Sequence, residues 1–310
     1  MTSIIASKDP CAAWQAGRFT LDVTRPHVMG IVNVTPDSFS DGGLHNSPIQ
    51  AIQHAEQLLK EGASILDLGA ESTRPGAPTV SLEEELRRLR PVLAELVKWN
   101  VPISVDTYKP EVMQVVLDLG CDIVNDIWAL RHPSAAVGAP TAGMVVAAHP
   151  SCGVCLMHMH RNPQSMQILP MSDQDVVLSV IQFLEQRIEY VQSMGVHLNR
   201  ISIDPGIGFG KTPQQNLELL ARQAELLELG CTVLAGWSRK STLGWVLNDD
   251  AFQAAPAVLQ ESRRQASVAA ALMAVERGAK VVRVHDVKET AQALAVWSAV
   301  QAHTTHSKED

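Results

Sequence analysis

Short apolar runs in this chain end on polar residues suited to chemistry, and the gaps between the runs are long enough for a helix. A continuous run of valine, isoleucine and leucine predicts a strand buried on both faces, and helical sequence between such runs predicts parallel strands. The runs end at Asn33, Asp67, Asp106, Asn125 with Asp126, Asp204, and Arg283 with His285. In a (β/α)8 barrel the C-terminal strand ends surround one pocket, so the pattern predicts an enzyme with this fold.

The length of 310 residues fits one barrel of about 250 residues with extensions. We find no internal linker that would divide the chain, so we expect a flexible leader over residues 1–17, a barrel over 18–302 and a tail over 303–310. Capping residues and apolar stripes at helical spacing predict the helices between the strands. These cover residues 48–61, 81–97, 110–120, 175–194, 217–229, 264–277 and 288–301, whereas 248–260 is expected to be a surface loop.

The chain is acidic, with 33 aspartate and glutamate residues against 25 lysine and arginine residues and a formal net charge of -8. Binding to the phosphate backbone of a nucleic acid requires a basic face, so we exclude this class of function. The amino terminus lacks a basic segment followed by an apolar core, and the apolar stretch over 135–157 is interrupted before it reaches membrane-spanning length. We therefore expect a cytoplasmic protein without a membrane partner.

Two short motifs suggest other chemistry. Cys152 and Cys155 form a CxxC, but no second pair lies nearby and reduced thiols are expected in a chain without a secretory signal, so we interpret them as structural. Residues 210–212 read Gly-Lys-Thr, which matches the end of a phosphate-binding P-loop. Pro205, however, occupies the position at which that loop needs glycine. We expect a tight turn with Lys211 outside the pocket.

Two loops rich in small and polar residues follow the first two predicted strands. The first begins after Asn33, which is placed to contact an anion or a metal bound to one, and the second contains Arg74, a fork of hydrogen-bond donors. Two such loops on one rim suggest a pair of mobile lids over the pocket. The lid residues are Thr35, Pro36, Asp37, Ser38 and Phe39 in the first loop and Ser72, Thr73, Arg74 and Pro75 in the second.

The remaining strand ends predict the chemistry of the ligand. Carboxylates and an amide at Asp106, Asn125 and Asp204 can pair edgewise with a flat heterocycle that carries amino groups and ring nitrogens. One buried aspartate is usually structural, but three polar groups that converge from different strands favour a ligand. The basic groups Lys240, Arg283 and His285 would hold a phosphorylated substrate against an acidic protein.

At this point the sequence resembles the dihydropteroate synthases, folate-pathway enzymes that join p-aminobenzoate to a dihydropterin. The resemblance covers nearly the whole chain from Met29 to about Val287. It rests on the motifs MGIVNVTPDSFSDGG, LDLGAESTRPGA, SVDTYKP, NDI, LMHM, DPGIGFGKT, SRKS and RVHDV, which occur in the family's order. The resemblance implies a single barrel that binds 6-hydroxymethyl-7,8-dihydropterin diphosphate, takes sulfonamides as inhibitors and forms a homodimer.

The resemblance also implies roles for individual residues. Asp106, Lys240 and Arg283 would be catalytic, and Asn33 would contact Mg2+ bound to the diphosphate. The p-aminobenzoate side would consist of Thr73, Arg74, Pro75 and Ser241. The pterin diphosphate would be held by Asp106, Asn125, Met157, Asp204, Phe209, Lys240, Arg283 and His285.

The chain departs from the family pattern at His160, Arg161 and Asn162, where relatives often have Gln-Gly, and at the bulky Trp128 and Trp237. Two alternatives remain open. A pterin-dependent methyltransferase would share the pterin-binding groups, but the SRKS, STRPG and RVH motifs speak against it. A barrel that binds pterin or a partner protein without catalysis would explain the same motifs if it bound pterin tightly and failed to turn it over.

Overall fold

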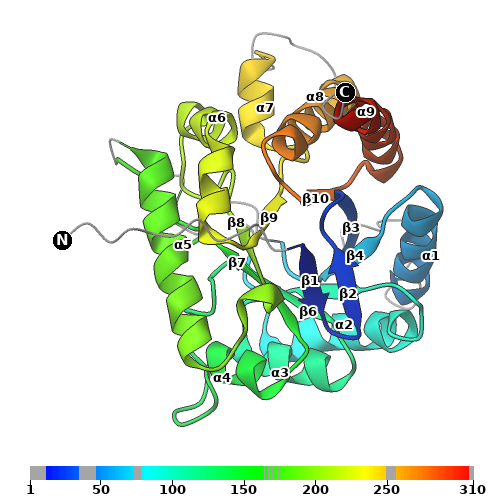
Figure 1. The fold of residues 1–310 in the computed structure, drawn as a ribbon. Helices are drawn as coiled ribbons and strands as arrows, with labels where there is room; N and C mark the ends of the chain where they lie inside the picture. Colours follow the sequence, from blue (N-terminus) through cyan, green and yellow to red (C-terminus); the bar gives the residue numbers. More distant parts are fainter. Residues whose placement is uncertain are drawn as a thin grey trace.

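Eight parallel strands form a closed barrel with helices around it (Figure 1). The strand order is β10-β3-β4-β5-β6-β7-β8-β9, so each strand pairs with its neighbour in sequence and β10 closes the barrel against β3. This confirms the predicted (β/α)8 fold. The computed structural model describes residues 12–34, 47–72, 78–163, 165–166, 168, 170–172, 175–248 and 256–306.

The barrel strands coincide closely with the apolar runs of the sequence. They are β3 (His27–Asn33), β4 (Ile65–Gly69), β5 (Ile103–Asp106), β6 (Ile123–Asp126), β7 (Gly153–Met157), β8 (Ile201–Asp204), β9 (Thr232–Ala235) and β10 (Val281–Val284). The helices are α1 (Ser47–Lys60), α2 (Leu82–Leu96), α3 (Pro110–Asp118), α4 (Ala142–Ala148), α5 (Val176–Ser193), α6 (Pro213–Ala221), α7 (Ser241–Val246), α8 (Pro256–Glu276) and α9 (Val287–His306), with short 3-10 helices at Leu198–Arg200 and Gln223–Leu229.

Alternate strand residues serve two apolar clusters, which explains the continuous apolar runs. Residues such as Leu66, Val124 and Ile203 belong to the large cluster shared with the surrounding helices. Their neighbours Ile65 and Ile123 belong to a second cluster inside the barrel. Because successive strand side chains point to opposite faces, each run has to be apolar on both sides.

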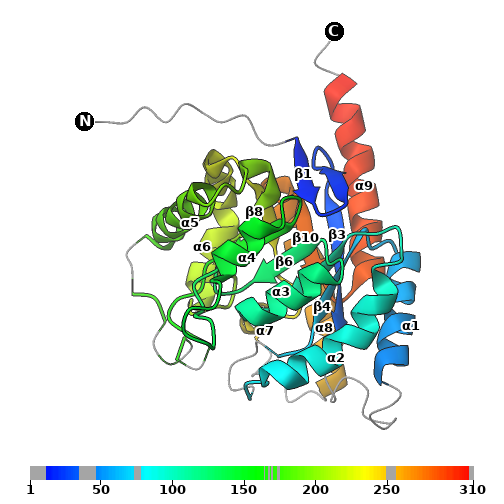
Figure 2. The same ribbon diagram turned by 90° about the horizontal axis from the view of Figure 1, so that it is seen from below.

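A hairpin of β1 (Ala13–Ala16) and β2 (Phe19–Asp22) lies against the barrel end at which the strands begin (Figure 2). Trp14 is fully buried in the inner cluster, and its Nε1 donates to the Arg200 carbonyl at 3.1 Å, just before β8. Arg18 pairs with Asp122, just before β6, at 2.9 Å. The predicted leader is therefore wrong for residues 12–17, because burial of Trp14 fixes this segment.

Local capping explains several helix boundaries. The Thr212 hydroxyl accepts from Gln215 N and the Gln215 side chain accepts from Thr212 N, which forms a capping box at the start of α6. At α2, the Ser81 hydroxyl accepts from Glu84 N, but the Glu84 carboxylate pairs with Arg87 and Arg88 instead. Only one of the two hydrogen bonds of a capping box therefore forms at α2.

The structure corrects three further predictions. The helix expected over 217–229 ends at Ala221 and continues as a 3-10 helix over Gln223–Leu229. Residues 256–260, expected in a surface loop, begin α8, and residues 303–306, expected in the tail, belong to α9. Within the described ranges, no helix combines the length and apolar character that a membrane span requires.

Candidate active site

The strand register brings the predicted polar residues to one level of the barrel. Asn33 is opposite Gly69, Gly69 is opposite Asp106, and Asp106 is opposite Asn125. A β-carbon added at Gly69 would lie 3.9 Å from Asn33 Oδ1 and 4.0 Å from Asp106 Oδ2. The glycine thus leaves space into which the side chains of both neighbours extend.

Arg283 crosses the barrel interior and joins two carboxylates from other strands. Its Nε donates to Asp67 Oδ2 at 2.6 Å, and its Nη2 donates to Asp106 Oδ2 at 2.8 Å. Asp67 also accepts from Ser104 Oγ at 2.5 Å and from Asn125 Nδ2 at 3.4 Å. A buried charge is stable only when it is paired and hydrogen-bonded, and this network meets that condition.

Burial and charge act in opposite directions on these groups. Burial raises the pKa of Asp106 from its ordinary value, while the nearby Arg283 guanidinium lowers it. Burial disfavours the charge of Arg283, but Asp67 and Asp106 outweigh it and raise the pKa of this residue. Arg283 therefore stays charged at the centre of the site.

The turn after β8 shapes the opposite side of the site. Gly206 N donates to Asp204 Oδ1 at 2.6 Å, and Lys240 Nζ lies 4.4 Å from the centre of the Phe209 ring. Burial lowers the pKa of Lys240 to about 8, against the opposing attraction of Asp204. A cation over an aromatic face, beside a carboxylate, can contact a ligand that is flat and polar at its edge.

Lys211 lies inside this turn. Its Nζ donates to the carbonyls of Gly206 at 2.8 Å, His158 at 3.3 Å and Phe209 at 3.4 Å, and the side chain is buried. Burial lowers its pKa to about 7. The lysine thus binds backbone carbonyls of the turn, in keeping with the interpretation that this segment is a turn and no P-loop.

An apolar wall completes the site. Met157, at the end of β7, and Phe209 belong to one buried cluster with Ile127, and Trp128 packs against that cluster. Met157 is also opposite Asp204 in the strand register, so the wall adjoins the polar strand ends. The bulky Trp128 therefore extends the wall.

Strands β9 and β10 pair in parallel, and Val282 lies opposite Ala235 at the end of β9. Ser238 Oγ lies 2.9 Å from His285 Nδ1, and His285 N donates to the same hydroxyl at 3.1 Å. Ser241 is exposed and begins α7. The structure thus brings His285 to the same rim as Lys240 and Arg283.

Several predicted residues lie outside the described ranges: Thr35, Pro36, Asp37, Ser38, Phe39, Thr73, Arg74 and Pro75. Ser72 is described and is exposed. The predictions of two mobile loops and of a p-aminobenzoate side formed by Thr73, Arg74 and Pro75 therefore stay predictions.

Within the described ranges, the groups present suit Mg2+ as an ion carried by a substrate. Among the described residues, no group of three or more histidine, cysteine, aspartate or glutamate side chains could hold a metal. Mg2+ usually keeps several waters and binds through one or two protein oxygens together with substrate phosphates. The Asn33 amide oxygen, at the end of β3, suits that mode.

The sequence did not identify all the polar groups that matter. Asp67 was recognised as a strand end, but its pairing with Arg283, 216 positions away, depends on barrel closure. Arg239 and Asp286 were not singled out, although they form a bidentate ion pair beside Ser238 and His285. The buried Cys152 and Cys155 are free thiols, as predicted.

Comparison with known proteins agrees with this geometry. The family model described as pterin binding enzyme matches residues 29–285. A dihydropteroate synthase of Neisseria meningitidis serogroup C is 49% identical over 290 residues, covering 93% of this chain and 97% of the relative.

Two solved structures are similar over nearly their whole length. One is a Burkholderia cenocepacia dihydropteroate synthase complexed with 7,8-dihydropteroate, with a TM-score of 0.82 and 44% identity over 96% of this chain and 99% of that one. The other is a Yersinia pestis dihydropteroate synthase with a sulfonamide drug complex, with a TM-score of 0.83 and 42% identity over 94% of this chain and 99% of that one. By these matches and by its site, the chain belongs to the pterin-binding enzyme family, among the dihydropteroate synthases.

Proposed function

We propose that this chain condenses 6-hydroxymethyl-7,8-dihydropterin diphosphate with p-aminobenzoate to give 7,8-dihydropteroate and diphosphate. The observation that carries the proposal is the pairing of Arg283 with Asp67 and Asp106 among the polar strand ends. The membership of the chain among the dihydropteroate synthases supports the same activity.

In this reaction, the bond between the pterin methylene carbon and a diphosphate oxygen breaks, and the bonding electron pair leaves with diphosphate. The amine nitrogen then forms the new bond to carbon and loses a proton. A dihydropterin ring can delocalise positive charge from that carbon, so the protein's task is to stabilise a cationic ring and a departing anion. No protein nucleophile is required.

Asp106, Asn125 and Asp204 would hold the edge of the pterin, and Met157 and Phe209 would pack on its faces. The negative charges of Asp106 and Asp204 favour a developing positive charge on the ring. Lys240 lies over Phe209 and would donate to the pterin from that side.

Arg283 and His285 would hold the diphosphate. The two observed bonds of Arg283 use Nε and Nη2, and a guanidinium has five donors, so the group can bind an anion while it keeps its carboxylate partners. Asn33 would contact Mg2+ carried by the diphosphate. The ion would supply positive charge that offsets the charge of the leaving group.

The p-aminobenzoate side would include Thr73, Arg74, Pro75 and Ser241. Sulfonamides resemble p-aminobenzoate, and a related protein is solved with a sulfonamide drug complex, so we expect competitive inhibition at this side. The two loops would complete the amine's site only after the diphosphate is bound, which predicts ordered binding. Product formation with either substrate bound first would contradict this order.

We also propose a cytoplasmic homodimer, by analogy with the family. Sedimentation velocity of the purified chain tests the oligomeric state, and a monomer at micromolar concentration would contradict the proposed dimer.

The proposed activity is tested by incubating the protein with dihydropterin diphosphate, p-aminobenzoate and Mg2+, and by detecting dihydropteroate by mass spectrometry. We expect product only when the protein and both substrates are present. Tight pterin binding without product would support the alternative of a barrel that binds pterin without catalysis.

A further inference from the structure

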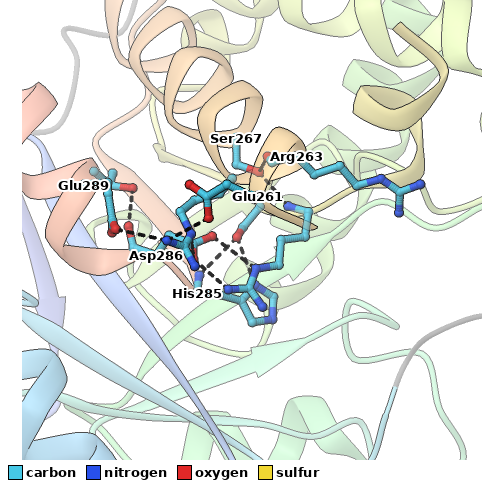
Figure 3. Close-up of polar contacts among 10 residues, drawn as sticks. Glu261, Arg263, Ser267, His285, Asp286 and Glu289 are labelled. Atoms are coloured by element: carbon cyan, nitrogen blue, oxygen red, sulfur yellow. Dashed lines mark hydrogen bonds and ion pairs between the residues drawn. The ribbon is translucent and has the colours of Figure 1, made fainter. Parts of the chain in front are cut away.

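Two adjacent contacts join the loop after β9 to the end of β10 (Figure 3). The first is the contact of Ser238 with His285 described above. One residue further along both segments, Arg239 Nε donates to Asp286 Oδ2 at 3.1 Å and its Nη2 donates to Asp286 Oδ1 at 2.6 Å. Consecutive residues of the two segments are therefore paired one to one.

The backbone of Arg239 lies in the left-handed region, with φ 57°. This conformation is uncommon for a residue other than glycine and persists only where the surroundings fix it. Here Arg239 N donates to Ser267 Oγ of α8 at 2.8 Å, while the side chain forks onto Asp286. Contacts from α8 and from the start of α9 thus determine the shape of the loop.

Asp286 is the buried centre of this cluster, because its side chain is only 6% exposed. Arg264 of α8 also pairs with it at 3.3 Å and contacts Glu261 and Glu289 at its outer edge. A buried carboxylate with one partner removed is strongly unfavourable, so Asp286 favours the arrangement that keeps Arg239 in place.

Lys240 directly follows Arg239, and His285 directly precedes Asp286. We infer that the Arg239–Asp286 pair is a positioning pair, which fixes Lys240 and His285 relative to each other so that they can hold the pterin and the diphosphate together. The inference rests on the proposed function, because the substrate roles of Lys240 and His285 belong to it. Misplacement of a binding group by about 1 Å can cost on the order of 100-fold in rate.

The test compares Arg239→Gly, Asp286→Asn and the double variant. Glycine adopts positive φ without strain, so Arg239→Gly removes the guanidinium and leaves the backbone conformation accessible. We expect each single variant to lower kcat/KM for dihydropterin diphosphate by roughly 10- to 100-fold, mainly through a higher KM. The double variant should be no worse than the poorer single variant, because both changes break the same interaction.

Arg264→Gln is the matched control, because it removes the longer contact of Asp286 and leaves the Arg239 fork to keep that carboxylate paired, so its kcat/KM should stay within about twofold of wild type. Arg239→Lys retains the positive charge but not the two-pronged hydrogen bond to Asp286, so its loss of kcat/KM should be intermediate. This variant keeps the test usable if the double variant does not fold. The folded fraction of every variant is measured by circular dichroism, and rates are expressed per folded molecule.

The inference is overturned by single variants at wild-type kcat/KM, by losses that multiply in the double variant, or by losses that disappear after correction for folded protein. An active wild-type protein with unaffected variants overturns the inference alone. A wild-type protein that forms no dihydropteroate overturns the proposed function and the inference with it.

Discussion

The two ends of the barrel bury different kinds of side chain. Where the strands begin, Trp14 of the β1–β2 hairpin closes an inner layer of apolar residues that includes Met29, Ile65 and Leu234. Where the strands end, the interior holds Asp67, Asp106, Asp204 and Arg283. Apolar burial stabilises a fold, whereas buried ion pairs contribute little net stability. The comparison indicates that the first end supports the fold and the second end is reserved for chemistry.

The largest expected effect is on activity at the strand C-terminal end. Arg283→Ala should lower kcat/KM for dihydropterin diphosphate on the order of 10³-fold, because it removes a preorganised charge from the leaving group. The barrel should stay folded, because burial raises the pKa of Asp106 so that this carboxyl can take up a proton, while Asp67 keeps its hydrogen bonds from Ser104 and Asn125. Diphosphate release measures the rate, and circular dichroism serves as the folding control. Wild-type rates would contradict the assignment of this site.

The next largest effect is expected at the other end of the barrel. Trp14→Ala should lower the free energy of unfolding by roughly 3 kcal/mol, because it opens a cavity and removes a large buried side chain. Turnover per folded molecule should stay near the wild-type value, since Trp14 lies at the barrel end remote from the strand C-termini. The change is measured by urea unfolding monitored by far-ultraviolet circular dichroism, which reports on the backbone and does not depend on the mutated tryptophan. A loss of turnover without a loss of stability would mean that Trp14 serves the chemistry of the protein and not its fold.

A smaller effect is expected in the pH dependence of the polar end. Burial lowers the pKa of Lys240 to about 8, so its ammonium is charged below that pH and neutral above it. The kcat/KM should therefore fall as the pH rises through about 8, by up to about tenfold per pH unit. Lys240→Arg should abolish this fall, because a guanidinium stays charged. If kcat/KM of Lys240→Arg still falls as the pH rises through about 8, the fall is caused by the titration of another group.

The smallest effect is expected from the rim of the hairpin. Arg18→Ala removes a half-exposed partner of the buried Asp122, which still accepts from Ile103 N at 3.0 Å. The free energy of unfolding should fall by about 1 kcal/mol, and turnover should not change. Urea unfolding at constant ionic strength checks the value, and a loss as large as that of Trp14→Ala would mean that the ion pair, rather than apolar burial, holds the hairpin.

The sequence predicted the polar end of the barrel better than the apolar end. Asp106, Asn125 and Asp204 follow long apolar runs, and a parallel sheet places such residues at one edge, so pattern alone identifies them. The hairpin has strands of four residues each, and the burial of Trp14 depends on contacts with Arg200, which no local pattern indicates. Short segments stabilised by distant contacts are therefore the ones that pattern misses.

The same reason separates the predicted site residues from the missed ones. Lys240, Arg283 and His285 were identifiable because each closely follows an apolar run in the sequence and because the motifs around them resemble those of a known family. The pairing of Arg283 with Asp67 and that of Arg239 with Asp286 join segments 216 and 47 positions apart. Such pairings exist only after the barrel closes, so a single sequence does not specify them.

The most direct test of the central claim is diphosphate release from dihydropterin diphosphate and Mg2+, measured with and without p-aminobenzoate for the wild type, Arg283→Ala and Trp14→Ala. The account predicts amine-dependent release by the wild type and by folded Trp14→Ala, with a loss on the order of 10³-fold in Arg283→Ala. Equal rates in Arg283→Ala and wild type, or loss of activity in folded Trp14→Ala, would contradict a division of the barrel into a supporting end and a chemical end.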